Sequence, residues 1–130
     1  MNIAVRYCSR SGNTKALAVA IGDAVGVDAV SVDSDKAAIK EPTDLLFIGG
    51  ALYAYGIDKR LKSYLQTLRK EDVKKAVVFS TSWLSKHALE LIKKALKNAG
   101  IETVEETLYF KGRPNEKQLE EAKEFAKRYI

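Results

Sequence analysis

The side chains best suited to bind a ligand lie near the start of the chain, in the run Cys8-Ser9-Arg10-Ser11-Gly12-Asn13-Thr14-Lys15. The apolar and β-branched stretch at residues 3–7 predicts a strand before this run, and apolar residues at helical spacing follow it as far as Ile21. A loop between a strand and a helix points backbone N–H groups and the positive end of the helix dipole at one place. The chemistry predicted for this loop is therefore the binding of a phosphate monoester.

Alternating strands and helices must position this loop. Strands are predicted at residues 2–7, 27–32, 44–48, 76–79 and 103–110, and helices at 12–25, 57–68, 84–99 and from Asn115 to the end. Residues 34–40 predict a short, weak helix. The pattern is typical of an α/β fold with three layers, a doubly wound five-stranded parallel sheet covered by helices on both faces. No repeat or domain boundary is visible, so we expect residues 1–130 to form a single domain.

Three predicted loops leave the carboxyl ends of strands, where open parallel sheets bind their ligands. The loop at residues 9–14 suits a phosphate, whereas those at residues 51–56 and 81–83 are uncharged and aromatic. Together they predict a polar anchor beside a flat, apolar slot. A planar aromatic cofactor with one phosphate fits this combination.

The run from Tyr7 to Thr14 resembles the signature of flavodoxins, whose corresponding loop binds the phosphate of flavin mononucleotide (FMN). The resemblance implies a flavodoxin-like fold with strand order 2-1-3-4-5 and FMN as the cofactor. It assigns the phosphate to Ser9, Arg10, Ser11, Gly12, Asn13 and Thr14, the first wall of the flavin slot to Ala51, Leu52, Tyr53, Ala54, Tyr55 and Gly56, and the second wall to Thr81, Ser82, Trp83 and Leu84. The candidates to stack on the ring are Tyr53, Tyr55 and Trp83, and Gly56 is the nearest match to a family glycine that faces flavin N5.

Each of these assignments has a purely structural alternative. The loop at residues 9–14 is also compatible with a capped helix start that binds nothing, and the aromatic residues with core packing. Cysteine phosphatases need an arginine six positions after the cysteine, where this chain has Thr14, so Cys8 is interpreted as a buried bystander. No metal-ligand spacing and no Ser–His–Asp pattern occurs, so any catalysis would belong to the cofactor.

Two functions on this fold, and one without flavin, remain open. The first is a small FMN-binding electron carrier. The second is a flavin-dependent oxidoreductase, either a quinone reductase or an enzyme of the protoporphyrinogen oxidase type, because residues 50–65 resemble the corresponding loop and helix of flavodoxin-like protoporphyrinogen oxidases. Those enzymes carry extra sequence before or within the last strand, which residues 102–110 lack. The third is a flavin-free binding module.

The charge distribution departs from that of most flavodoxins, which are acidic. The chain has a formal net charge of +5. The predicted helices at 57–68 and 84–99, with the two residues that follow the first of them, contribute Lys59, Arg60, Lys62, Arg69, Lys70, Lys86, Lys93, Lys94 and Lys97 against Asp58 and Glu90. We expect this basic face, next to both flavin walls, to meet an acidic redox partner protein. Nucleic acid is not favoured, because 17 acidic residues are interspersed and no arginine-rich cluster occurs.

The location of the chain is predicted from its cysteine content and hydropathy. Cys8 is the only cysteine, so no disulfide can form within the chain, and a reducing cytoplasm is expected. No apolar run approaches the roughly 18 residues of a spanning helix, so no membrane span is expected.

Overall fold

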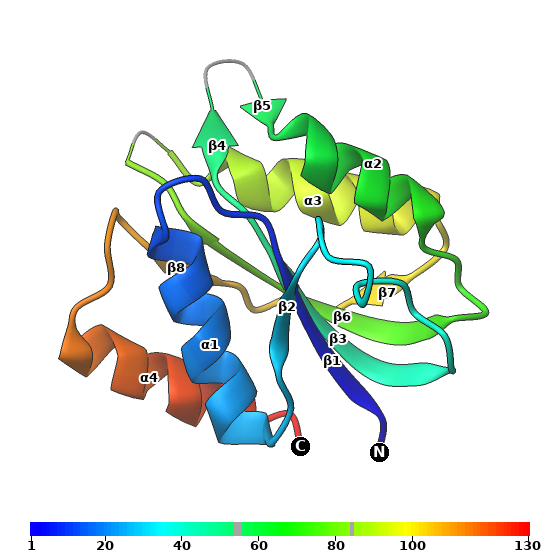
Figure 1. The fold of residues 1–130 in the computed structure, drawn as a ribbon, viewed down its shortest axis with the longest axis horizontal. Helices are drawn as coiled ribbons and strands as arrows, with labels where there is room; N and C mark the ends of the chain where they lie inside the picture. The colour runs from blue at the N-terminus through cyan, green and yellow to red at the C-terminus, as the bar shows by residue number, and fades with distance from the viewer. Residues whose placement is uncertain (54–55, 84) are drawn as a thin grey trace.

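The computed structural model describes residues 1–53, 56–83 and 85–130 as a parallel sheet between two layers of helices (Figure 1). The strands are β1 (Ile3–Tyr7), β2 (Ala29–Ser31), β3 (Thr43–Gly49), β4 (Leu52–Tyr53), β5 (Gly56–Ile57), β6 (Val73–Thr81), β7 (Glu102–Thr103) and β8 (Leu108–Phe110). The helices are α1 (Asn13–Val25), α2 (Lys59–Thr67), α3 (His87–Asn98) and α4 (Glu116–Lys127). None of these helices is both long and apolar enough to cross a bilayer.

The main sheet has the predicted strand order. Its path runs β2-β1-β3-β6, and β7 and β8 both pair with the far side of β6. All of these pairings are parallel. Because β7 and β8 are successive pieces of one strand, the sheet has five parallel strands in the order 2-1-3-4-5, and this prediction is confirmed. A separate antiparallel hairpin of β4 and β5 follows β3.

The last strand is interrupted, which the sequence did not predict. Along β6 the register advances three residues, from Ala76 to Phe79, while the partner advances five, from Thr103 to Leu108. The two extra residues bulge out of the ladder between β7 and β8. The Lys93 ammonium of α3 donates a hydrogen bond to the carbonyl oxygen of Glu105 in this bulge at 3.0 Å. The prediction of one continuous strand at residues 103–110 is therefore wrong for residues 104–107, which separate β7 from β8.

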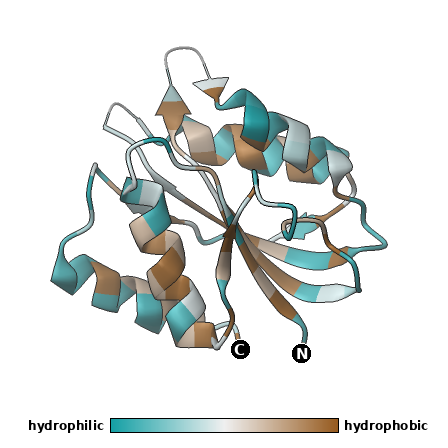
Figure 2. Cartoon of the chain, in the orientation of Figure 1, coloured by the Kyte–Doolittle hydropathy of each residue, from teal (hydrophilic) through white to brown (hydrophobic). Residues whose placement is uncertain are grey.

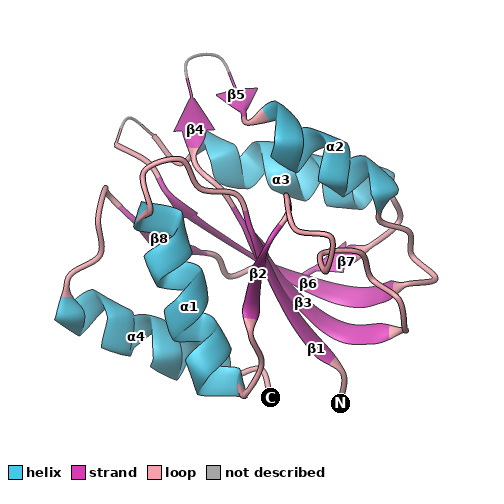
Figure 3. Cartoon of the chain, viewed as in Figure 1, coloured by secondary structure: helices cyan, strands magenta, loops and turns pink. Residues whose placement is uncertain are grey.

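Two apolar clusters cover the two faces of the sheet. Figure 2 shows the hydrophobic residues concentrated in the strands and on the helix sides that face them. Alternate residues of β3 and β6 point to opposite faces. Phe47 and Phe79 pack with α1 and α4, whereas Leu46, Ile48 and Val78 pack with α2 and α3. The prediction that the helices around residues 57–68 and 84–99 share one face is confirmed (Figure 3).

The short helix expected at residues 34–40 is wrong. This segment forms turns, in which the backbone N–H of Ala37 bonds to the carbonyl oxygen of Ser34. The carbonyl oxygen of Ala37 accepts hydrogen bonds from Arg6 Nε at 2.8 Å and from the Tyr64 hydroxyl at 2.5 Å. Because two buried side chains donate hydrogen bonds to this carbonyl oxygen, tertiary contacts outweigh the weak local preference for a helix.

The ends of two helices differ from the prediction. Ile57 belongs to β5, and α2 begins only after Asp58, whose carboxylate accepts a hydrogen bond from the backbone N–H of Arg60 at 2.8 Å. The next helix begins at His87 instead of residue 84. For α4 the expected start is confirmed, because Asn115 and Gln118 form a reciprocal capping box.

Candidate functional site

Three hydrogen bonds join the three loops that the sequence predicted to lie together at the carboxyl edge of the sheet. The hydroxyls of Thr14 and Thr81 lie 2.7 Å apart and join α1 to β6. The backbone N–H of Leu52 donates to Ser82 Oγ at 2.9 Å, which joins the two predicted flavin walls. The backbone N–H of Arg10 donates to the hydroxyl of Tyr53 at 3.2 Å. The loops after β1, β3 and β6 therefore form one connected site.

The N-terminus of α1 is open. Its N-cap is Gly12, in the left-handed conformation with φ 93°, and within the described chain no side chain caps the helix. By contrast, α2 and α4 are capped by Asp58 and Asn115. The first-turn N–H groups of a helix lack acceptors within the helix, and the helix dipole adds positive potential there. The start of α1 is therefore able to bind an anion.

Two serine hydroxyls of the same loop are oriented by its backbone. Ser9 Oγ accepts a hydrogen bond from the N–H of Gly12 at 3.0 Å, and Ser11 Oγ lies 3.5 Å from the N–H of Asn13. A hydroxyl that accepts a hydrogen bond still has its own proton to donate. Both serines therefore keep an O–H donor for a ligand oxygen beside the open helix end.

Thr14 and Thr81 are buried, with 1% and 4% of their surface exposed. Of the two protons in this hydroxyl pair, one is used between the two oxygens and the other remains free. The pair thus holds α1 against β6 and leaves one donor in the site.

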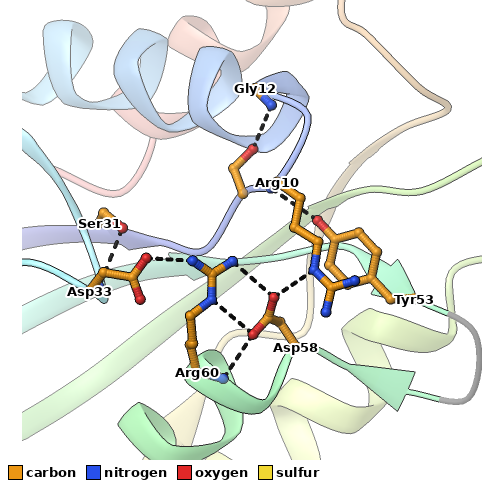
Figure 4. A network of polar contacts seen from close by, with 8 residues as sticks. Arg10, Gly12, Ser31, Asp33, Tyr53, Asp58 and Arg60 are labelled. Atoms are coloured by element: carbon orange, nitrogen blue, oxygen red, sulfur yellow. Dashed lines mark hydrogen bonds and ion pairs between the residues drawn. The ribbon is translucent and has the colours of Figure 1, made fainter.

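Arg10 connects the loop at residues 9–14 to the start of α2 (Figure 4). Its Nε donates to Asp58 Oδ2 at 2.8 Å, and its guanidinium carbon lies 3.9 Å from the ring centroid of Tyr53. Arg60 also binds Asp58 through two hydrogen bonds, of 3.0 and 2.9 Å, and reaches Asp33 at 2.6 Å. One buried carboxylate is thus shared by two arginines from different segments.

The Asp58 carboxylate is charged because of these arginines. Hydrogen bonds from the Arg60 side chain lower the pKa of Asp58 well below its usual range, although burial opposes this shift. The same contact raises the pKa of Arg60 above its ordinary value. The prediction that Asp58 is one of the charges on the basic face is wrong, since Asp58 is only 4% exposed. Its place directly before a lysine–arginine pair at a helix start was the available signal, because Asp is a preferred N-cap residue.

Trp83 lies on the surface of the second wall. It is 66% exposed, which excludes the core alternative for this residue. Its indole lies against Gly112, where φ is 72° and an added Cβ would come within 2.4 Å of the ring. The adjacent backbone is held by Tyr109, whose hydroxyl donates to the carbonyl oxygen of Ser82 at 2.5 Å. The loop after β8 therefore helps to position the second wall, a role that no sequence motif indicated.

Three of the six remaining predicted wall residues, Ala51, Leu52 and Gly56, lie in the described part of the chain. Ala51 is buried and Leu52 is half-buried at the base of the hairpin, where Gly56 pairs with Tyr53. Ala54, Tyr55 and Leu84 lie outside the described residues. A flavin ring stacked on Tyr53 would have to use the face of the phenol opposite Arg10, or displace that side chain.

Cys8 has no feature of a reactive thiol. It is 1% exposed, and burial raises the pKa of its thiol. A buried thiol that resists deprotonation is a poor nucleophile. Across residues 1–53, 56–83 and 85–130, no group of three histidine, cysteine or acidic residues is placed to hold a metal ion.

Comparison with known proteins shows the family of this chain. The family model described as "Flavodoxin domain" matches residues 4–129. The chain belongs to the flavodoxin family. No match was found among curated proteins.

Several solved flavodoxin structures are similar over nearly the whole chain. A flavodoxin from the domain Archaea has a TM-score of 0.85 and 27% identity, over 97% of this chain and 94% of that one. Flavodoxin 1 from Bacillus cereus has a TM-score of 0.82 and 20% identity, over 99% and 97%. The same fold occurs in rubredoxin:oxygen oxidoreductase from Desulfovibrio gigas, with a TM-score of 0.81 and 15% identity, where the similarity covers 97% of this chain but only 34% of the larger one.

Proposed function

We propose that this flavodoxin-family chain binds FMN and acts as a small electron-transfer carrier. The observation that carries the proposal is the open N-terminus of α1, which lies beside the oriented hydroxyls of Ser9 and Ser11. A phosphate monoester is a dianion near neutral pH with several acceptor oxygens, and helix N-termini bind such groups. Membership of the flavodoxin family supports the choice of FMN among phosphate ligands.

The residues of the chain would share the work of holding this cofactor. The first-turn N–H groups of α1, with Ser9, Ser11 and the free proton of the Thr14–Thr81 pair, donate to the phosphate. The hairpin of β4 and β5 and the loop after β6 enclose the ring, and the Leu52–Ser82 hydrogen bond fixes their spacing. The bound flavin supplies the electron chemistry, while these walls orient it and limit the access of water.

The experiment that tests the proposal compares FMN with riboflavin, which lacks the phosphate. Quenching of flavin fluorescence gives both dissociation constants. Two charge-assisted hydrogen bonds contribute about 1.5–3 kcal/mol each, so FMN should bind at least roughly 100-fold more tightly. Ser9→Ala combined with Ser11→Ala should weaken FMN binding and leave riboflavin binding nearly unchanged. Equal affinity for the two flavins, or none for either, would rule out the proposed anchor.

The carrier is favoured over the oxidoreductase by the last strand. The interruption between β7 and β8 contains only two residues beyond the register of β6. The resemblance to protoporphyrinogen oxidases implies a longer addition at this place. Steady-state reduction of a soluble quinone by the FMN-loaded chain separates the two functions. We expect negligible turnover, and rapid turnover would favour the oxidoreductase.

The proposed redox partner is an acidic protein that docks near the basic face of α2 and α3. The support is the net charge of +5 and the exposed lysines of these two helices. Opposite charges on two proteins accelerate their encounter, and this acceleration falls as salt is added. A rate of electron transfer that did not depend on ionic strength would contradict steering by this face.

A further inference from the structure

A groove of about 910 Å³ runs between the first half of α2 and the outer side of α3. Three half-buried apolar residues, Ile57, Leu91 and Ala95, form its floor. Three exposed lysines border it, Lys59 and Lys62 on α2 and Lys94 on α3. Of the described residues that line the groove, Arg10 is the one that also belongs to the predicted phosphate loop. The groove therefore combines an apolar strip with positive charge on both sides.

The positive charge of the groove is not cancelled from within. Among its described lining residues, the one carboxylate is Asp58, which is already neutralised by Arg10 and Arg60. Lys59, Lys62 and Lys94 make no ion pair with any described residue. An occupant that complements this groove would therefore be acidic as well as partly apolar.

The length and position of the groove favour a segment of protein chain as the occupant. Leu91, Ala95 and Asn98 line it along α3 at spacings of four and three residues, which is about 10 Å of helix. This length suits contact with two turns of an amphipathic helix laid between α2 and α3. At its other end the groove reaches Gly56 and Tyr53 of the first flavin wall. A segment bound here would thus lie against one side of the flavin slot.

We propose that this groove binds an acidic, amphipathic segment of the protein that exchanges electrons with the chain. Apolar side chains of the segment cover Ile57, Leu91 and Ala95, and its carboxylates meet the three lysines. The proposal rests on the proposed function for the identity of the partner. The three lysines that border the groove set the rate of association and its salt dependence, while the apolar floor slows dissociation of the complex.

A synthetic probe tests the groove directly. The probe is a 14-residue peptide with leucines at helical spacing and glutamates between them, titrated into the isotope-labelled full chain with and without FMN. We expect NMR shift changes to concentrate at residues 57–62 and 91–98. A control peptide of the same composition, with its leucines dispersed around the helix, should bind at least roughly tenfold more weakly, the equivalent of about 1.4 kcal/mol.

Matched charge reversals complete the test. Lys59→Glu with Lys94→Glu should weaken peptide binding at least roughly tenfold, whereas Lys117→Glu with Lys127→Glu, the same charge change on α4, should alter it less than threefold. Equal losses in both pairs, or shifts spread over both faces of the sheet, would overturn the proposal. Titration of FMN into each variant is a separate readout. If wild type binds the peptide in the groove but takes up no FMN, the proposed function fails while the groove stands.

Discussion

Two helix starts at the same edge of the sheet differ in how their N–H groups are satisfied. The start of α2 is filled by the protein itself, because the Asp58 carboxylate caps the helix and binds both Arg60 and Arg10. The start of α1 has Gly12 in a left-handed conformation and no described side chain as a cap. One end is thus neutralised internally, and the other keeps its positive potential for an external anion.

This difference shows how one helix start stays open while a neighbouring one is closed by the protein's own side chains. Asp58 occupies the start of α2 with its own carboxylate, and it also holds the side chain of Arg10 between the two helix starts. The positive charge of Arg10 remains near the open end of α1 but is balanced by Asp58. If the proposed FMN phosphate binds at α1, capping of α2 by Asp58 leaves the start of α1 as the open one of these two positions.

The largest effect is expected from removing the internal carboxylate. Asp58→Ala removes the cap of α2 and leaves two arginines without their partner, so the free energy of unfolding should fall by about 2–4 kcal/mol. Asp58→Asn should cost less, because asparagine still caps the helix. Urea unfolding of the flavin-free chain measures both. Asp72→Ala, which breaks an exposed ion pair with Arg69, is the control and should cost under about 1 kcal/mol. Similar losses for Asp58→Ala and Asp72→Ala would refute the special role of Asp58.

A somewhat smaller effect is expected from the hydroxyl pair that holds the open helix end. Thr14→Val leaves the buried hydroxyl of Thr81 without its partner and should destabilise the chain by about 1–3 kcal/mol. Combining Thr14→Val with Thr81→Val should cost less than the sum of the single changes. A double-mutant cycle from urea unfolding gives the coupling. Simple additivity would mean that this contact does not join α1 to β6 energetically.

A third effect isolates the backbone conformation of Gly12. An added Cβ meets no atom within 4 Å at this position, so only the positive φ opposes a side chain. Gly12→Ala should therefore lower the free energy of unfolding by about 1–2 kcal/mol. Gly12→Asn should cost less, since asparagine tolerates the left-handed region. Thermal unfolding of the two variants provides the measurement, and a more stable alanine variant would contradict the expectation.

The smallest effect is a dependence on pH. The folded pKa of Asp58 lies below its unfolded value of about 3.9, so its ion pairs stabilise the fold fully above that value. This stabilisation is lost progressively as the pH falls below about 4. The difference in unfolding free energy between wild type and Asp58→Asn should be constant from pH 7 to 5 and narrow between pH 4 and 2. A gap that widened toward low pH would have the wrong sign.

The fold could be predicted from the sequence because its signals are local and repeated. The continuous apolar runs of β3 and β6 indicate strands covered on both sides, and glycine or asparagine marks several helix ends. The interruption of the last strand escaped prediction. Thr103 and Leu108 fit a continuous alternating pattern, and only pairing with β6 reveals the two extra residues.

For the candidate site, the position of the loop at 9–14 between β1 and α1 could be predicted from local patterns, whereas its role in binding a phosphate stays a prediction. The links between loops could not be predicted, since Arg10 and Asp58 lie 48 positions apart and Tyr109 and Ser82 lie 27 apart. The local sequence around each of these residues does not indicate which distant residue it contacts. The role of Gly112 likewise depends on the indole of Trp83, which a distant strand brings next to it.

The interruption between β7 and β8 also bears on how the chain avoids self-association. Both pieces lie on the outer side of β6, at one margin of the main sheet, and they span two and three residues. A long, flat outermost strand offers unpaired backbone groups on which another chain can add a strand, whereas short and bulged ones do not. Two exposed glutamates lie between the pieces: Glu105 adds negative charge at this edge, whereas Glu106 is paired with Arg128. The short, interrupted edge strand of β7 and β8 thus protects the sheet from edge-to-edge aggregation.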